Sequence, residues 1–165
     1  MTDAVLMTVT GVRVELPSNT PIVLLREQNG ARFLPIWVGA VEATAIASAM
    51  ENVVPPRPLT HDLLKSTIEA LGATVSRVVV TELRDSVFFA DLVFETEGGE
   101  VVVSSRPSDA IALAVRTGAP VFAAPEVLAE AAIELEDETA EEEIERFREF
   151  LEEVTPEDFE GSGES

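Results

Sequence analysis

The feature that most limits the fold of this chain is a series of tight-turn signals between short apolar segments. Asn29-Gly30 separates two strand-like segments, and Gly98-Gly99 separates two more. Asp85-Ser86 joins a further pair of strand-like segments closely. Asn-Gly and Gly-Gly readily adopt the backbone that a short hairpin turn needs. The sequence therefore predicts several antiparallel hairpins.

The apolar periodicity predicts a mixture of strands and helices. An alternation of period two indicates strands, and a period near 3.6 indicates helices. We expect strands over residues 4–16 (with a bulge near Thr10-Gly11), 21–25, 31–38, 73–84, 86–95, 100–104 and 120–122. We expect helices over residues 40–51, 60–71, 107–117 and 125–132, with Thr60 as an N-cap, and Pro35 favours an edge position for its strand. This is an α+β fold, with mixed, mostly antiparallel sheets and a few covering helices.

The charge of the chain is distributed unevenly. Of 165 residues, 31 are acidic and 11 are Lys or Arg, which gives a net charge of −20. Residues 126–165 hold 17 of the acids and two of the bases. We therefore expect a domain over residues 1–132 and an acidic C-terminal extension over 133–165, helical over 139–153 and disordered at its end. The extension is either a solvated tail or a segment that mimics nucleic-acid charge or binds a partner.

Composition excludes several classes of protein. The chain has no Cys, so it has no disulfides and no thiolate chemistry. It has no basic leader followed by an apolar run and no segment long enough to cross a membrane, so a cytoplasmic location is expected. Its acidity also argues against a broad basic surface for duplex nucleic acid. Any contact with nucleic acid must be local.

Two short segments resemble each other. Arg57-Pro58-Leu59-Thr60-His61-Asp62 and Arg106-Pro107-Ser108-Asp109 each place Arg-Pro at the start of an expected helix, followed by a hydroxyl and a carboxylate. A helix N-terminus attracts anions, and an adjacent Arg matches the geometry of phosphate. Two such segments, one beside the only His, suggest a phosphodiester pocket. Alternatively, they are ordinary helix-capping sequences.

Glu42 is a further candidate, because it lies in the middle of the apolar arc of its expected helix. Ala45, Ile46, Ala49 and Met50 surround it on a helical wheel. A carboxylate in that position needs a partner or a function. Either it contributes to a site, or it simply meets the helix N-terminus and an Arg.

Several blocks of the chain together resemble the bifunctional nuclease family. They are Leu34-Pro35-Ile36-Trp37-Val38-Gly39, Glu42-Ala43, Arg57 to Leu63, Phe89-Ala90-Asp91-Leu92 and Ser105 to Ala114. The resemblance covers roughly residues 4–130, and it implies DNase and RNase activity. The polar residues that match by position are Glu42, Arg57, Thr60, His61, Asp62, Arg106, Ser108 and Asp109.

Phosphodiester hydrolysis assigns possible roles to these residues. Arg57, Arg106, Thr60 and Ser108 could bind substrate phosphate, and His61, the only imidazole, could act as general base or acid. As candidate catalytic residues, Glu42, Asp62 and Asp109 could hold Mg²⁺ or Mn²⁺. No organic cofactor is implied. Alternatively, His61 is a polar boundary residue, and the two arginines neutralise these acids in a structural network.

Three functions remain open from the sequence. The first is a nuclease, possibly metal-assisted, that hydrolyses single-stranded DNA or RNA. The second is a non-enzymatic anion- or nucleotide-binding regulatory module that acts as a homo-oligomer; the single Lys and the scarcity of aromatic residues favour it. The third is a structural adaptor whose acidic extension binds a basic partner. The apolar strands that contain Phe88, Phe89 and Phe94, and the first hairpin, could pair across a dimer.

Overall fold

A computed structural model describes residues 3–15 and 18–134 of the chain. Its strands are β1 (Val5–Glu15), β2 (Thr20–Glu27), β3 (Arg32–Trp37), β4 (Thr74–Arg84), β5 (Val87–Thr96), β6 (Gly99–Ser105), β7 (Val121–Ala123) and β8 (Ile133–Glu134). Its helices are α1 (Ala40–Met50), α2 (Thr60–Ala70), α3 (Pro107–Thr117) and α4 (Pro125–Ala131). The helix expected over 139–153 and most of the acidic extension lie outside the described residues.

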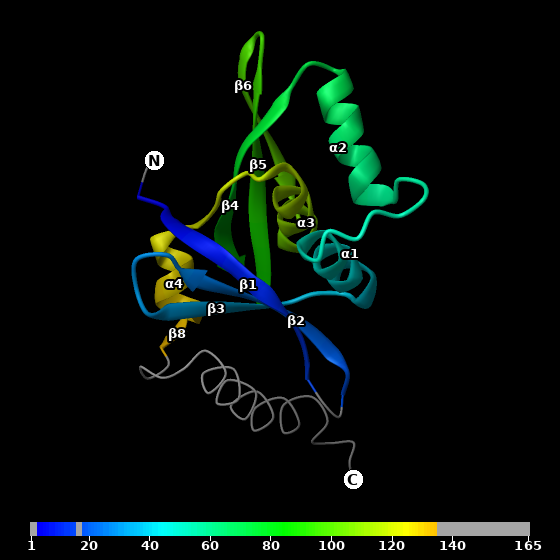
Figure 1. Cartoon of the computed structure of the whole chain (residues 1–165). Coiled ribbons are helices and arrows are strands. Elements are labelled where there is room, and N and C mark those ends of the chain that lie inside the picture. Colours follow the sequence, from blue (N-terminus) through cyan, green and yellow to red (C-terminus); the bar gives the residue numbers. More distant parts are fainter. Residues whose placement is uncertain (1–2, 16–17, 135–165) are drawn as a thin grey trace.

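All eight strands described form one sheet in the order β6-β5-β4-β7-β1-β2-β3-β8. The pair β4 and β7 is parallel, and every other neighbouring pair is antiparallel. The short strand β7 therefore joins the two groups of hairpins, which cross each other in Figure 1. This mixed, mostly antiparallel sheet with four helices confirms the predicted α+β class.

The turn signals are confirmed, and one edge assignment is wrong. Asp85 and Ser86 both have positive φ, as a two-residue hairpin turn requires, and the β1–β2 register shifts between Val9 and Gly11. Pro35 predicted an edge strand, but β3 lies between β2 and β8. Within the described part of the chain, β8 pairs only with Arg32 and Phe33, so Pro35 has no strand partner on that side.

Helix α3 lies at the centre of the fold, with α1 and α2 packed against it (Figure 1). Residues 107, 108 and 110–114 are buried, which matches the apolar residues that encircle most of this helix. Pro107 occupies its first turn, and Gly118 ends it in the left-handed conformation. The N-terminus of α3 is therefore fixed in position.

The start of α2 differs by one residue from the prediction. Leu59, and not Thr60, is the N-cap residue. The reason is that the carboxylate of Asp62 accepts a hydrogen bond from the backbone N–H of Leu59, with an N···O distance of 3.0 Å. Thr60 becomes the first helical residue, and His61 follows it in the first turn.

One large apolar core holds both halves of the sheet and α3 together. It includes Leu25, Leu34, Ile46, Leu92 and Ile111. A second, smaller cluster of Ile22, Leu24 and Phe33 covers the other face of β2 and β3. Among the described residues, no helix is long and apolar enough to cross a membrane.

Candidate functional site

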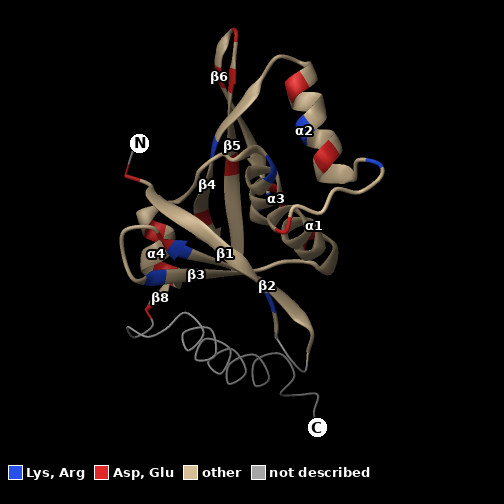
Figure 2. Cartoon of the chain, in the orientation of Figure 1, with Lys and Arg blue, Asp and Glu red and all other residues tan. Residues whose placement is uncertain are grey.

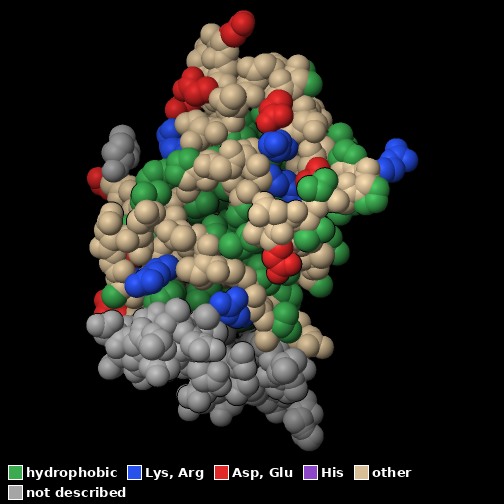
Figure 3. Space-filling view, viewed as in Figure 1, with side chains coloured by type: hydrophobic (Ala, Val, Ile, Leu, Met, Phe, Trp, Pro, Cys, Tyr) green, Lys and Arg blue, Asp and Glu red, His purple; other side chains and the backbone are tan. Residues whose placement is uncertain are grey.

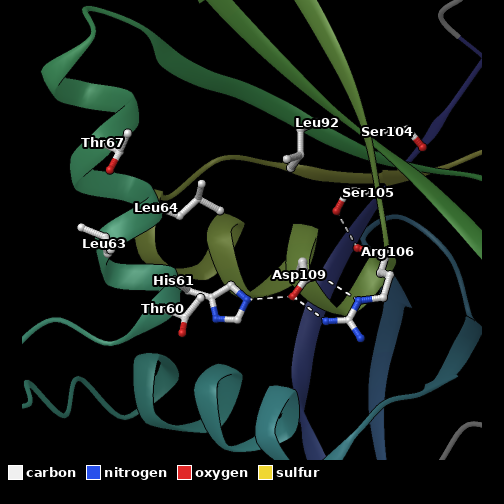
Figure 4. Close-up of a pocket in the computed structure, with 10 residues that line it drawn as sticks. All are labelled: Thr60, His61, Leu63, Leu64, Thr67, Leu92, Ser104, Ser105, Arg106 and Asp109. Carbon is white, nitrogen blue, oxygen red and sulfur yellow. Dashed lines mark hydrogen bonds and ion pairs between the residues drawn. The ribbon is translucent and has the colours of Figure 1, made fainter.

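The first turns of α2 and α3 meet through a histidine and an aspartate. His61 Nε2 lies 2.9 Å from Asp109 Oδ1, although the two residues are 48 positions apart in the sequence. His61 is only 7% exposed, whereas the side chain of Asp109 is 31% exposed. Each of the two similar sequence segments therefore contributes residues to this site, His61 from one and Asp109 from the other (Figure 4).

Arg106 extends this pair into a chain of four side chains. Its Nε lies 2.8 Å from Asp109 Oδ2, and its Nη2 lies 3.1 Å from Asp109 Oδ1. Nη2 also lies 2.9 Å from Oε2 of Glu42 on α1. The Nη1 atom of Arg106 has no hydrogen-bond partner among the described residues, and the side chain is 63% exposed. One edge of the guanidinium thus remains available to an anion.

These contacts settle the charges of the two carboxylates. Burial raises the pKa of Asp109, but hydrogen bonds from Arg106 and His61 outweigh burial and lower it below its usual value. Its own backbone N–H and Arg106 lower the pKa of Glu42. The hydrogen bonds to Asp109 and, to a smaller extent, to Glu42 raise the pKa of Arg106 above its usual value. Both carboxylates are therefore ionised at neutral pH.

An ionised Asp109 determines which nitrogen of His61 carries the proton. A carboxylate can only accept hydrogen bonds, so Nε2 of the neutral ring is the donor. Nδ1 then holds the lone pair, and it makes no hydrogen bond to any residue that the structure describes. An imidazole oriented by a carboxylate on one nitrogen and free on the other is suited to accept a proton.

Asp62, which we expected in the same site, has different partners. Its Oδ1 lies 2.7 Å from Nε of Arg116 on α3, and its Oδ2 caps α2 at Leu59. The hydrogen bond from Arg116, and to a smaller extent that from the Leu59 N–H, lowers the pKa of Asp62. The side chain of Arg116 is only 8% exposed and also donates to the carbonyl oxygen of Ala112. This ion pair holds α2 against α3. It is separate from the contacts that join Glu42, Arg106, Asp109 and His61.

The other expected phosphate ligands are dispersed. Thr60 is exposed and lies beside His61 at the cleft. Arg57 is exposed in the preceding loop and has no ion pair within the described part of the chain. Ser108 is only 6% exposed, and it lines a separate cavity on the other side of Arg106. The structure brings Glu42, His61, Arg106 and Asp109 together, and Arg57 and Ser108 remain outside that chain.

An open cleft of about 720 Å³ lies between α2, the middle of β5 and the end of β6. Its lining residues are drawn in Figure 4: Thr60, His61, Leu63, Leu64, Thr67, Leu92, Ser104, Ser105, Arg106 and Asp109. Apolar side chains form one wall, and the His61–Asp109–Arg106 chain forms the floor. The cleft is large enough for a nucleotide-sized ligand.

The residues near the cleft do not fit the three-carboxylate metal site that we expected. Within residues 3–15 and 18–134, no three His, Asp or Glu side chains converge to hold a metal ion. Asp62 is paired with Arg116, and Arg106 neutralises both Glu42 and Asp109. We therefore assign no chemical step to a divalent ion.

The charges around the site are local. Figure 2 shows acidic and basic residues alternating along α2, and on the face in Figure 3 the Lys and Arg side chains lie in a few small, separate groups. No continuous basic surface is visible on that face among the described residues. An anionic ligand on this face is therefore recognised by individual basic groups and not by a broad basic surface.

Sequence reasoning missed the roles of Arg116 and of the cleft wall. Arg116 shares the narrow polar stripe of α3 with Asp109, two turns away, and this spacing could have indicated that both face α2. No sequence signal singles out Thr67 or Ser105, since isolated hydroxyl residues are common on exposed surfaces.

The sequence of this protein is similar to those of known proteins. The family model of the bifunctional nuclease domain matches residues 23–136 of this protein. These residues include Glu42, His61, Arg106 and Asp109. The chain belongs to the bifunctional nuclease domain family. It is 47% identical over 159 residues to an uncharacterized protein of Mycobacterium tuberculosis. This match covers 92% of the present chain and 95% of the mycobacterial protein.

Relatives with nuclease names are more distant members of the bifunctional nuclease family. Bifunctional nuclease 2 of Arabidopsis thaliana is 34% identical over 112 residues, 64% of this chain and 34% of its own length. Bifunctional nuclease 1 of Oryza sativa subsp. japonica is 30% identical over 103 residues, 61% of this chain and 31% of its own length. The matched part is thus about a third of each plant protein.

Proposed function

We propose that this protein is a nuclease that hydrolyses phosphodiester bonds of single-stranded DNA or RNA in the cleft beside α2. The observation that carries the proposal is the His61–Asp109–Arg106–Glu42 chain on the floor of that cleft. The family match and the names of the plant relatives support it. The location in the cytoplasm that the sequence predicts is compatible with such substrates.

In the proposed reaction, His61 transfers the proton and Arg106 stabilises the charge on the phosphoryl group. Nδ1 of His61 removes a proton from a water molecule, whose oxygen attacks phosphorus as the bond to the leaving oxygen breaks. The free edge of Arg106 neutralises a phosphoryl oxygen, and the leaving oxygen takes a proton from solvent. Asp109 stabilises the imidazolium that forms, and Glu42 holds Arg106 from its other side.

A matched set of variants tests this proposal. Cleavage of single-stranded DNA and RNA is measured for the wild type, His61→Ala and Lys65→Ala, a control on the same helix. His61→Ala should lower the rate by about 10²–10⁴-fold, the usual contribution of a positioned proton-transfer group. Each assay is run with Mg²⁺, with Mn²⁺ and with a chelator, which measures any metal dependence directly. Equal rates for the wild type and His61→Ala would overturn the proposal.

One observation favours the alternative of a non-enzymatic binding module. Arg106 already pairs with two carboxylates, which reduces the charge that it offers to phosphate. In that case the cleft binds a nucleotide or another anion without hydrolysis. Binding of single-stranded oligonucleotides, measured together with the absence of any cleavage that depends on His61, would establish this alternative.

We also propose that the protein forms a homo-oligomer through β6. This strand lies at one edge of the described sheet, and Val101, Val102 and Val103 are 46%, 54% and 45% exposed. An exposed apolar edge strand is a template for pairing with a second copy. Val102→Lys should shift the mass measured by light scattering toward the monomer, and an unchanged mass would contradict β6 pairing.

A further inference from the structure

A second cavity of about 300 Å³ lies on the other side of Arg106 from the cleft. It is bounded by the end of β3, the turn between β4 and β5, and the first turn of α3. Arg106 lines both this cavity and the cleft. A ligand with an anionic group at Arg106 can therefore extend into either space.

Two aromatic side chains contribute to the walls of this cavity. Trp37 ends β3 and is 40% exposed, and Phe88 near the start of β5 is half-buried. Trp37 is the single Trp of the chain, which has no Tyr. Exposed aromatic rings at the wall of a cavity provide surfaces on which a flat ring can stack.

A buried hydroxyl adds a polar group to the same cavity. Ser108 is only 6% exposed, and its side chain makes no hydrogen bond to any described residue. Buried hydroxyl groups nearly always have a partner, so this one is available to a ligand. A serine hydroxyl can donate or accept, and it can therefore bind the polar edge of any nucleobase.

We propose that this cavity is a nucleobase subsite, in which Trp37 and Phe88 contact an unpaired base and Ser108 binds its edge. The phosphate next to that base lies at the free edge of Arg106. The inference rests on the proposed function and narrows its substrate class: a base held in a duplex cannot enter the cavity, so the substrate must be single-stranded at this position.

Trp37 gives this subsite its own spectroscopic probe. The full-length protein is titrated with a single-stranded oligonucleotide and with a matched oligonucleotide of the same length made of abasic residues. The phosphates are identical, so only the bases differ. The Trp37 fluorescence should change with the first and not with the second. Equal changes with both, or no change with either, would overturn the proposal.

A third titration, with a mononucleotide, tests whether the cavity binds a free nucleotide or requires a nucleic-acid strand. A nucleotide that changes the fluorescence at similar concentration shows that the subsite recognises a single nucleotide unit. A much weaker response shows that neighbouring phosphates of a strand are required. Both results support a base-binding cavity, and they separate a free nucleotide from a nucleic-acid strand as its ligand.

Variants complete the test with an independent readout. Trp37→Leu should weaken binding of the base-containing oligonucleotide about tenfold, as loss of one stacked base does, and leave the abasic one unaffected. Affinity is measured by fluorescence anisotropy of a labelled oligonucleotide. Trp37→Phe should restore most of the affinity, and Leu71→Ala, an exposed apolar residue distant from the cavity in sequence, is the control. Equal weakening for both oligonucleotides would indicate a merely structural role and contradict the subsite.

These outcomes are independent of those for the proposed function. Cleavage that requires His61, without discrimination between base-containing and abasic strands, would remove the subsite and leave the nuclease. Discrimination without cleavage would retain the subsite in a binding protein.

Discussion

The two Arg-Pro segments look alike in the sequence, but they have different roles in the structure. The segment before α3 places Arg106 and Asp109 in a chain of contacts with His61 and Glu42. The segment before α2 leaves Arg57 exposed and directs Asp62 toward Arg116. The comparison shows that a shared local pattern sets where a helix begins, whereas the tertiary partner of each carboxylate decides its role.

The difference between the two aspartates has a physical basis. Asp109 lies next to the open cleft, and its partners include an imidazole whose second nitrogen is free. Asp62 contacts a nearly buried guanidinium and a backbone N–H, so all of its contacts are internal. We therefore expect substitutions of Asp109 to affect chemistry and substitutions of Asp62 to affect stability.

The largest expected contrast is in the rate of cleavage. Asp109→Asn should lower the rate by about 10²–10⁴-fold, because the amide no longer fixes His61 with its proton on Nε2. Asp62→Asn should leave the rate of the folded protein within about fivefold of the wild type, since the side chain of Asp62 hydrogen-bonds to Arg116 and Leu59 and not to the imidazole of His61 or to Arg106. Both rates are measured with one single-stranded oligonucleotide under single-turnover conditions. A larger loss in Asp62→Asn than in Asp109→Asn would reverse the assignment.

The second contrast is in the free energy of unfolding. Asp62→Ala should lower it by about 2–3 kcal/mol, because it leaves Arg116 buried without its ionic partner and removes the cap of α2. The expected loss is below that of a fully buried pair because the Asp62 side chain is 28% exposed. Arg57→Ala should change the free energy of unfolding by less than about 0.5 kcal/mol.

Denaturant titration of the double variant Asp62→Ala/Arg116→Ala sharpens this result. If the two residues stabilise the fold as a pair, the double variant should lose less than the sum of the single variants. Strict additivity would show that the ion pair makes no coupled contribution.

The third expectation concerns pH. The pKa values of Glu42, Asp62 and Asp109 are all lowered in the folded protein. The stability that they contribute is therefore complete above their unfolded pKa values, near 4, and it is lost as the pH falls through the folded values. The free energy of unfolding, measured by denaturation at several pH values between 7 and 2, should decrease on acidification. Asp62→Asn should make this decrease shallower, and an unchanged pH dependence would contradict the lowered pKa.

The smallest expected effect is on binding by Arg57. If this exposed side chain contacts a phosphate of single-stranded nucleic acid, Arg57→Ala should weaken binding a few-fold. It should also reduce the slope of log K against log salt concentration by about 0.7, the value for one phosphate contact on a single strand. Arg77→Ala, on β4, is a matched control for net charge. Identical salt slopes for Arg57→Ala and the wild type would remove Arg57 from the binding surface.

Local features of the fold could be predicted from the sequence, because short-range chemistry determines them. Hairpins form at Asn29-Gly30 and at Asp85-Ser86, the latter with the positive φ angles of a two-residue turn, and the helix from Pro107 ends at Gly118 as expected. The joining of two groups of hairpins through β7 could not be predicted, since only three residues carry that pairing. The strand position of Pro35 depended on β8, whose two residues gave no strand signal.

The candidate site was predictable in its residue types and unpredictable in its pairs. The helical wheel showed that Glu42 required a partner, but Arg106 lies 64 residues away. Nothing in the sequence distinguished Asp62 from Asp109, because each follows an Arg-Pro start. Their partners, Arg116 and His61, are 54 and 48 residues distant, and only the packing of α2 on α3 determines them.

In the proposed mechanism, Asp109 orients the one imidazole of the chain so that its Nδ1 can accept a proton. Because His61 is the only histidine, the ¹⁵N signals of its ring can be recorded without overlap. We expect the tautomer with the proton on Nε2 in the wild type, a different tautomer balance in Asp109→Asn, and a change at Nδ1 when a non-hydrolysable single-stranded oligonucleotide binds. A proton on Nδ1 in the wild type, or identical spectra in the two proteins, would contradict it.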